Sequence, residues 1–262
     1  NVTNKHVGAV VKSWQDRGLE TKTIKEYLSG VRATAEANGN NSIHKANSAF
    51  GLENIKYVKN IDKSMHDAKL TSIMKNLKAG GNHEIRVAAQ LGLCRHLGLR
   101  HEEARKFNPS RDVLPDGRVH VAAGAKGGKE RVLSEISPEG RNAIENARSV
   151  AGTGSMIPPD MRDSQWEKKG YKILEKAGAN KKYEKFHSAR HAYAQLRYEQ
   201  LTGFKCRVKF ESKEAFAQAA IEARGENWKD YDKSARGIIK VEMGHGLDRD
   251  STVAQYLGSN SK

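Results

Sequence analysis

Hydrophobic residues recur at helical spacing along the first part of the chain. Thr3 can cap a first helix, which Gly18 ends. Its apolar face follows the i, i+3, i+4, i+7 pattern: Val7, Val10, Val11 and Trp14. This spacing predicts an amphipathic helix that packs on its neighbours.

A second helix starts at Thr21, and residues 38–48 are rich in Asn and Ser and predict a loop. The apolar face of that helix contains Ile24, Tyr27, Leu28 and Val31. A third helix is predicted over residues 64–77, and Gly80-Gly81 is the best linker candidate. We therefore expect a helical domain over residues 1–78 and a second domain over residues 79–262. Trp14, Tyr27 and Val31 are expected in the core rather than in a base-stacking surface.

The second domain begins with a helical pattern over residues 83–93, and the pattern then changes. Short β-type runs occur at 113–114, 119–121 and 132–133. Asp116-Gly117 and Gly127-Gly128 separate them, which predicts an antiparallel sheet of three strands.

Helices follow the predicted sheet. Pro138 occupies a favourable start position for the next one. The predicted ranges are 138–147, 164–176, 187–201, 213–224 and 234–243. The expected fold class is mainly α with a small antiparallel β-sheet.

The charge balance points to a polyanionic partner. The 262 residues include 46 Lys and Arg against 31 Asp and Glu, which gives a net charge of +15 and a pI of about 9.7. DNA or RNA is the simplest partner for such a chain. No long apolar run predicts a membrane span, and no secretory signal is recognisable, so we expect a cytoplasmic protein without membrane contact. The chain starts at Asn1 rather than Met, and we expect a fragment or a processed product.

Neither a disulfide framework nor a metal site is expected. Cys94 and Cys206 are predicted to be reduced thiols. The ten histidines include no His-x-x-x-His pair backed by carboxylates, and His96 and His101 suit structural or solvated roles. Asp248 and Asp250 lie close together, but the sequence brings no further acidic group to them. We therefore expect no metal and no cofactor.

Four short motifs carry candidate chemistry in the second domain. They cover 98–103, 124–131, 187–191 and 243–245, the last followed by Tyr256. Each has a simple structural interpretation when taken alone: a solvated arginine, an exposed lysine in a turn, a His-Arg pair on a helix surface and a packing tyrosine. Together, two arginines, a lysine, two histidines and a late tyrosine are the groups that phosphoryl transfer on DNA requires without a metal.

The ordered set resembles the tyrosine recombinases, the phage-integrase family, which share their active site with type IB topoisomerases. The matching stretches are Gly98 to Glu103, Lys126 to Arg131, His187 to His191, and Met243-Gly244-His245 with Tyr256. The resemblance covers about residues 80–262. Residues 21–35 resemble the helical core-binding domain of the family, so the two domains are expected to be a core-type DNA-binding domain and a catalytic domain.

The resemblance implies that three residues bind the scissile phosphate. Arg100 and Arg190 would clamp it, and His245 would hydrogen-bond one of its oxygens. Glu103 would have a structural role, as an anion that supports one of these groups without binding the phosphate.

The resemblance implies three further roles in bond breaking. Tyr256 would attack phosphorus to give a 3′-phosphotyrosine and a free 5′ hydroxyl. His187 would assist proton transfer at the tyrosine. Lys126 would protonate the leaving 5′ oxygen, with Lys129 as the rival for this role.

The sequence departs from the family pattern in two places. The distance from Arg190 to His245 is longer than usual, which suggests an insertion between residues 202 and 234. The insertion is either a solvated segment or an additional contact to DNA or a partner, and contains Lys205, Arg207, Lys209 and Trp228. The spacing from His245 to Tyr256 is about two residues longer than usual, which affects the placement of the tyrosine loop.

The functional prediction is a site-specific DNA recombinase, an integrase of a mobile element. Its partners would be double-stranded DNA, three further copies in a tetramer on two DNA sites, and accessory DNA-bending proteins. It would act in the cytoplasm of a bacterial or phage-infected cell, at the nucleoid when bound to DNA. The alternatives are a type IB topoisomerase-like enzyme and a non-catalytic DNA-binding regulator on the same fold.

Overall fold

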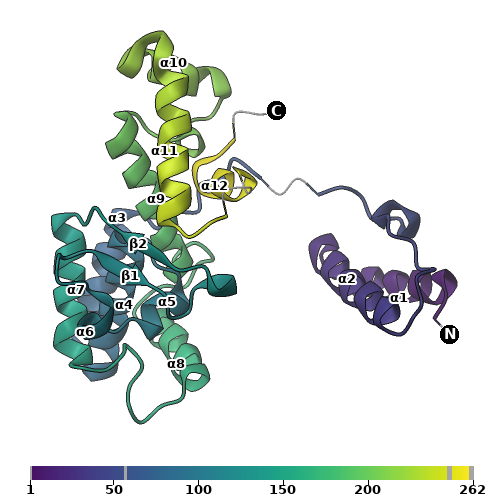
Figure 1. Ribbon diagram of the computed structural model, residues 1–262, viewed down its shortest axis with the longest axis horizontal. Helices are drawn as coiled ribbons and strands as arrows, with labels where there is room; N and C mark the ends of the chain where they lie inside the picture. The colour runs from purple at the N-terminus through teal and green to yellow at the C-terminus, as the bar shows by residue number, and fades with distance from the viewer. Residues whose placement is uncertain (1, 56–57, 247–249, 260–262) are drawn as a thin grey trace. The chain divides into compact units, whose positions relative to one another are not determined.

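The computed structural model describes residues 2–55, 58–246 and 250–259, and the chain forms two compact units (Figure 1). The first is Asn1–Tyr57 and the second is Val58–Lys262. We expected the division after residue 78, so the observed boundary lies about one helix earlier in the chain.

The first unit is helical, as its apolar spacing predicts. Helix α1 (Asn4–Asp16) is capped by Thr3, whose hydroxyl accepts from the backbone N–H of His6. Helix α2 (Thr21–Ala37) and the short helix η1 (Asn47–Phe50) complete it. Its core contains Val7, Val11, Ile24, Leu28, Ala35, Ile43 and Leu52.

Tyr27 differs from the expected core position. Its side chain is 50% exposed, and its ring packs edge-on against Trp14 with 5.4 Å between centroids. The position lies at the margin of the apolar face, where the ring covers Trp14 and still meets solvent.

Helix α3 (Asp67–Lys78) belongs to the second unit. Its buried Ile73 and Leu77 join the core that contains Leu91 of helix α4 (Asn82–His96). Gly80 and Gly81 therefore connect two packed helices of one unit. The glycine pair predicts a bend in the chain but not a unit boundary. The boundary depends on which core the apolar face of α3 packs into, and only the structure shows this.

Helix α4 runs through the centre of the second unit, and every residue from Val87 to Arg95 is buried. The helices that contact it are α3, α5 (His101–Lys106), α7 (Pro138–Ala151), α8 (Asp163–Lys176) and α9 (Phe186–Thr202), and α6 (Pro109–Asp112) packs against α7. Because the central part of α4 is covered on all sides, its apolar residues lie on every face. Its amphipathic pattern is therefore weak.

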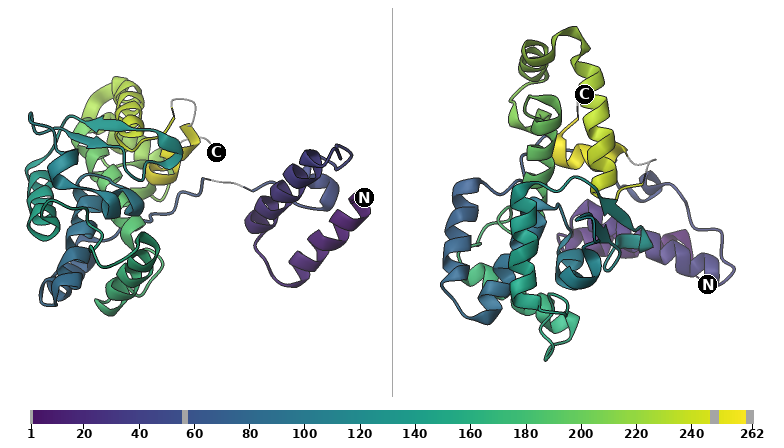
Figure 2. Two further views of the ribbon diagram at one scale, coloured as in Figure 1. Left: turned by 60° about the horizontal axis from the view of Figure 1, so that its bottom comes forward. Right: turned by 60° about the vertical axis from the view of Figure 1, so that its left-hand side comes forward.

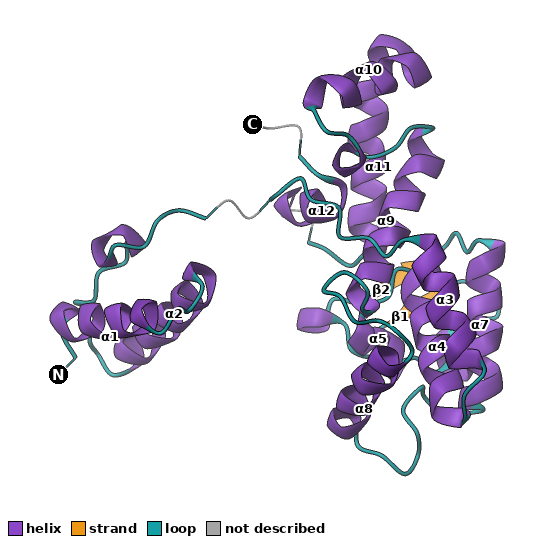
Figure 3. Ribbon diagram, turned by 180° about the vertical axis from the view of Figure 1, so that it is seen from behind, coloured by secondary structure: helices purple, strands orange, loops and turns teal. Residues whose placement is uncertain are grey.

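The sheet is smaller than predicted. Among the described residues it has two antiparallel strands, β1 (Val119–Val121) and β2 (Arg131–Leu133), shown in orange in Figure 3. Val113 contributes a single bridge to Val119 in place of a third strand. A tight turn in which the N–H of Gly117 donates to the carbonyl of Leu114 reverses the chain directly after Val113, so only one residue can pair.

The predicted insertion is a folded helical region. It contains η3 (Arg207–Lys209), α10 (Lys213–Arg224) and η4 (Gly225–Asn227), followed by α11 (Trp228–Glu242) and α12 (Asp250–Leu257). Phe204, Phe216 and Trp228 are buried in a second core with Tyr198 of α9. Helices α10 and α11 stand at one end of the unit, as Figure 1 and the right-hand view of Figure 2 show. This region therefore is not a solvated loop, and α11 begins six residues before the predicted start.

No helix in the described ranges is long and apolar enough to cross a membrane.

Candidate active site

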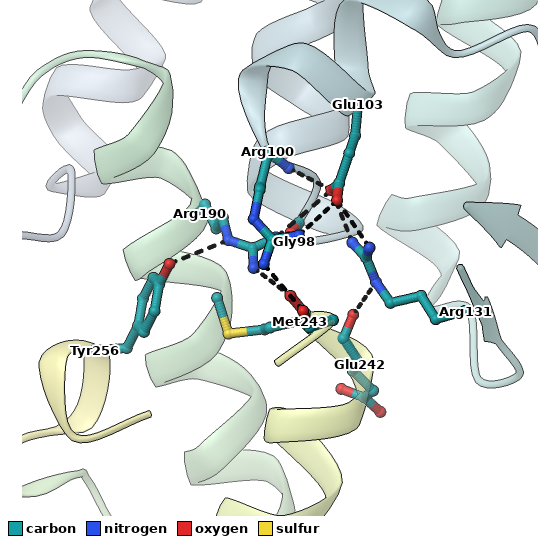
Figure 4. Close-up of polar contacts among 9 residues, drawn as sticks. Gly98, Arg100, Glu103, Arg131, Arg190, Glu242, Met243 and Tyr256 are labelled. Atoms are coloured by element: carbon teal, nitrogen blue, oxygen red, sulfur yellow. Dashed lines mark hydrogen bonds and ion pairs between the residues drawn. The ribbon is translucent and has the colours of Figure 1, made fainter. Parts of the chain in front are cut away.

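Arg190 of α9 is fully enclosed, with 0% exposure. Its Nε donates to the hydroxyl of Tyr256 over 3.3 Å, and its Nη2 donates to the carbonyl of Met243 over 2.5 Å. Its Nη1 donates to the carbonyl of Gly98 (Figure 4). The planar guanidinium thus links three segments that are remote in sequence: the α4–α5 connection, the end of α11, and α12.

Glu103 of α5 is the anion at the centre of the arginines. Its carboxylate accepts two bonds of 2.8 Å from Arg131 and one of 2.7 Å from the side chain of Arg100. The backbone N–H of Arg100 donates to it over 2.7 Å, and Nη1 of Arg190 lies 3.7 Å away. Burial alone would raise the pKa of Glu103, but the bonds and charge of Arg131, with Arg190 and Arg100, hold this pKa at about 2. Glu103 is therefore ionised and fixes the guanidinium groups around it.

Three consecutive carbonyls at the end of α11 each accept from a different arginine. The bonds run from Arg131 Nε to Glu242 (2.6 Å), from Arg190 Nη2 to Met243 (2.5 Å) and from Arg100 Nη2 to Gly244 (3.1 Å). Carbonyls at a helix C-terminus carry partial negative charge and lack helical partners, so cations satisfy them well. The end of α11 is thus a frame for three positive side chains.

Gly244 is required by this frame. Its φ is +63°, and a Cβ at this position would lie 2.8 Å from Nη1 of Arg131 and 3.3 Å from Nη1 of Arg100. The arginines occupy the space that any other side chain would fill.

Tyr256 lies in α12 with its ring buried to 5% exposure. Three imidazole rings surround it: centroid distances are 5.7 Å to His187, 4.3 Å to His191 and 5.7 Å to His245. The backbone carbonyl of Tyr256 accepts from Gln195 over 3.3 Å, which ties α12 to α9. The structure therefore gathers the predicted tyrosine, both predicted arginines and both predicted histidines in one place.

The imidazoles are held in the neutral form. Burial, followed by the charges of Arg190 and Arg100, lowers the pKa of His245 to about 3. His187 is exposed to solvent, but partial desolvation followed by the charges of Arg190 and Arg100 lowers its pKa as well. Each neutral ring can accept a hydrogen bond at one nitrogen and donate one from the other.

Comparison with known families identifies the fold around this site. A family model described as Integrase matches residues 56–196, more than half of the chain. The chain belongs to the integrase family. This confirms the resemblance to the tyrosine recombinases. The matched range includes Arg100, Lys126, His187 and Arg190 and ends before His245 and Tyr256. No curated protein matches the chain.

Solved structures share the fold at low sequence identity. XerH site-specific recombinase bound to a palindromic difH substrate is 15% identical over 98% of this chain and 66% of that chain, with a TM-score of 0.60. A lambda integrase (75–356) dimer bound to a COC′ core site is 15% identical over 100% and 81%, with a TM-score of 0.58. The Tn1549 transposon integrase (82–397) in complex with circular intermediate DNA is 12% identical over 99% and 82%, with a TM-score of 0.56. The mainly helical fold with its small antiparallel sheet is thus that of the integrase relatives.

Lys126 is the predicted site residue for which the structure describes no contact with the cluster. It is exposed in the turn η2 (Lys126–Gly128) between the strands, and it forms no hydrogen bond or ion pair with a residue that the structure describes. Lys129 is exposed in the same turn. Gly124, at the base of the turn, packs so closely on Glu102 that a Cβ would lie 3.0 Å from the backbone of that residue. The turn therefore starts beside α5, and both lysines are exposed to solvent on it.

Three residues of the cluster had no assigned role in the sequence analysis: Arg131, His191 and Glu242. Arg131 closes the hairpin motif and His191 closes the His187 motif, so their places in those motifs were the available signal. Glu242 precedes the Met-Gly-His stretch and lies in none of the motifs. Its contacts with Arg131 bridge 111 positions of sequence, which no local pattern reports.

The remaining predictions for histidines and acidic residues concern metal binding. His101 stacks on Phe186 with 3.7 Å between ring centroids, and burial followed by the charge of Arg105 lowers its pKa to about 3. It is a packing residue. In the described part of the chain, no three His, Cys, Asp or Glu side chains form a group that could hold a metal ion. Asp248 and the side chain of Asp250 lie outside the described residues.

Proposed function

We propose that the chain is a site-specific DNA recombinase that cuts and rejoins DNA through a 3′-phosphotyrosine. The observation that carries the proposal is the hydrogen bond between the buried guanidinium of Arg190 and the hydroxyl of Tyr256. A phosphate that replaces the hydroxyl at Arg190 would lie directly beside Tyr256, so the two reacting atoms would be within reach of each other.

The phosphate would enter from the side of Arg100. The side chain of Arg100 is 20% exposed, whereas that of Arg190 is fully covered. A phosphate therefore reaches Nε of Arg190 only when the Tyr256 hydroxyl leaves that atom, and attack on phosphorus requires the same displacement. Binding and alignment of the nucleophile would thus be one movement.

The chemical balance needs no ATP. The tyrosine oxygen forms a bond to phosphorus, and the bond from phosphorus to the 5′ oxygen breaks. His187, neutral at the outset, accepts the phenolic proton, and Lys126 supplies a proton to the 5′ oxygen once its turn folds over the DNA. Arg100, Arg190 and the neutral ring of His245 stabilise the charge that develops on the phosphate. The reverse reaction with another 5′ hydroxyl rejoins the strand.

Double-stranded DNA is the proposed partner. The net charge of +15 favours a polyanion and predicts a steep salt dependence. One structural neighbour is a lambda integrase tetramer bound to a Holliday junction, and others are dimers on DNA. We propose that this chain likewise works as a tetramer on two DNA sites.

Supercoiled plasmid tests the proposal directly. Wild-type protein, Tyr256→Phe and the control Tyr231→Phe are incubated with plasmid and quenched in SDS. Tyr231 is a half-exposed tyrosine of α11, outside the site. We expect protein attached to DNA 3′ ends with the wild type and the control, and none with Tyr256→Phe. An adduct that survives in Tyr256→Phe contradicts the assigned nucleophile. Relaxed topoisomers without strand exchange between two sites would favour the topoisomerase-like alternative, and salt-sensitive binding without adduct would favour the regulator.

A further inference from the structure

Tyr193 of α9 lies between the two backbone segments that hold Arg190. Its ring covers Gly98 so closely that a Cβ there would lie 2.4 Å from Cδ1 of the ring, and φ of Gly98 is +62°. Its hydroxyl donates to Oε2 of Glu242 over 3.0 Å. The Tyr193 side chain therefore contacts Gly98, which supplies one carbonyl to Arg190. It also contacts Glu242, the neighbour of the residue that supplies the other carbonyl.

Glu242 is fixed from a second direction. Arg197, one turn further along α9, donates to its carboxylate from Nε over 3.1 Å and from Nη2 over 2.9 Å. Arg197 also pairs with Glu135, just after β2. The Glu242 side chain is only 16% exposed, so these bonds are shielded from water. The carboxylate is thereby held against α9, and the backbone carbonyls at the end of α11 are held with it.

The position of these carbonyls decides where the guanidinium of Arg190 lies. Gly98 and Met243 accept from its two Nη atoms, and a change in either segment rotates the fork that would bind the phosphate. Misplacement of a reacting group by about 1 Å can cost on the order of 100-fold in rate. Hydrogen bonds around a clamp thus affect the reaction without contacting the substrate.

We propose that Tyr193 and Glu242 are positioning residues that set the orientation of Arg190 for cleavage. The inference rests on the proposed recombinase function and assigns a role to two residues outside the motifs of the family. Burial and the charge of Glu242 raise the pKa of Tyr193, so its hydroxyl keeps the proton that it donates. The ring sets the distance to the Gly98 segment, and the hydroxyl sets the distance to the end of α11.

Two conservative variants separate positioning from packing. Tyr193→Phe keeps the ring on Gly98 and removes only the hydroxyl. Glu242→Gln keeps the shape of the side chain and removes the charge that Arg197 binds. Tyr231→Phe on α11 and Glu222→Gln on α10 make the same chemical changes at exposed positions.

The first measurement is the rate of adduct formation at saturating supercoiled plasmid, with plasmid affinity and the thermal unfolding midpoint measured in parallel. We expect both test variants to slow adduct formation by about 10- to 100-fold while plasmid Kd changes less than about two-fold. The control variants should match the wild type. Wild-type rates in Tyr193→Phe and Glu242→Gln overturn the inference, and so does a rate loss explained by an equal loss of plasmid binding or of folded protein.

The second measurement needs no DNA. In ¹⁵N NMR spectra of the full chain, the Nε–H signal of the buried Arg190 is expected to shift in Tyr193→Phe and in Glu242→Gln and to stay in place in both controls. An unchanged Arg190 signal overturns the inference. If the wild type forms no adduct, the proposed function fails, and the NMR comparison alone decides whether the two residues orient Arg190.

Discussion

The Nε atom of Arg190 donates a hydrogen bond to the Tyr256 hydroxyl over 3.3 Å within a single chain. Helix α12 also packs against α9, and the exposures of the two side chains are 0% and 5%. The nucleophile and the proposed phosphate clamp thus contact each other within one copy of the protein.

This arrangement predicts cleavage in cis. A mixture of Tyr256→Phe and Arg190→Ala proteins offers one intact clamp and one intact tyrosine on different chains. Because each tyrosine serves the arginine of its own chain, we expect no adduct from the mixture on supercoiled plasmid. Adduct formation restored by mixing would show that the tyrosine is donated between copies.

Glu103 is predicted to be essential for stability at neutral pH. Glu103→Gln leaves three arginines around an uncharged amide, and we expect a loss of about 3–5 kcal/mol in the free energy of unfolding. Glu102→Gln is the matched control, since its carboxylate is 52% exposed and pairs only with Lys106 among the described residues. Urea unfolding curves at pH 7 measure both, and equal midpoints for the two variants would contradict the prediction.

The pKa of Glu103 also predicts a pH dependence. This pKa is about 2 in the folded chain, below the value of about 4.3 for an unperturbed glutamate. The stabilisation is therefore fully present above about pH 4.3 and is lost as pH falls towards 2. Urea unfolding between pH 5 and 2.5 should show a steeper loss for the wild type than for Glu103→Gln. Parallel pH profiles would mean that Glu103 is not the group responsible.

Gly244→Ala should reduce cleavage far more than stability. A Cβ at Gly244 meets the guanidinium groups of Arg131 and Arg100, whose flexible ends can move away at the expense of the site geometry. We expect a loss of adduct formation of about 10-fold or more and a stability loss of about 1–2 kcal/mol from the left-handed backbone. Gly51→Ala is the control, because its φ is +67° with no atom within 4 Å. Equal effects of both variants on cleavage would argue against the clash.

The two lysines of the hairpin turn give a matched pair. Both are exposed, so Lys126→Ala and Lys129→Ala should each change stability by less than about 0.5 kcal/mol. If Lys126 protonates the leaving 5′ oxygen, its loss slows cleavage by about 100-fold or more, and the loss of Lys129 has a smaller effect. Single-turnover adduct formation separates them, and a larger effect at Lys129 would exchange the two assignments.

The site was predictable from the sequence to the extent that its motifs are local. Arg190 and His191 belong to a short motif on one helix, and Tyr256 is the only tyrosine after His245. The ion cluster was harder to predict from the sequence, because Arg131 and Glu103 are 28 positions apart and either could have been a solvated charge. Tyr193 had no signal at all, since a tyrosine two residues after the His-Arg motif reads as ordinary packing.

The sequence by itself determined most of the helices, because helix periodicity and capping depend on residues within a few positions of one another. The capping of α1 by Thr3 and the apolar face of α2 are of this kind. Tertiary structure alone decided that α3 joins the second unit, that residues 202–234 pack into a second core shared with α9, α11 and α12, and that the end of α11 holds three arginines. These features depend on contacts between buried residues that are far apart in the sequence. Burial and charge compensation select the partner of each residue, and the local sequence pattern does not specify it.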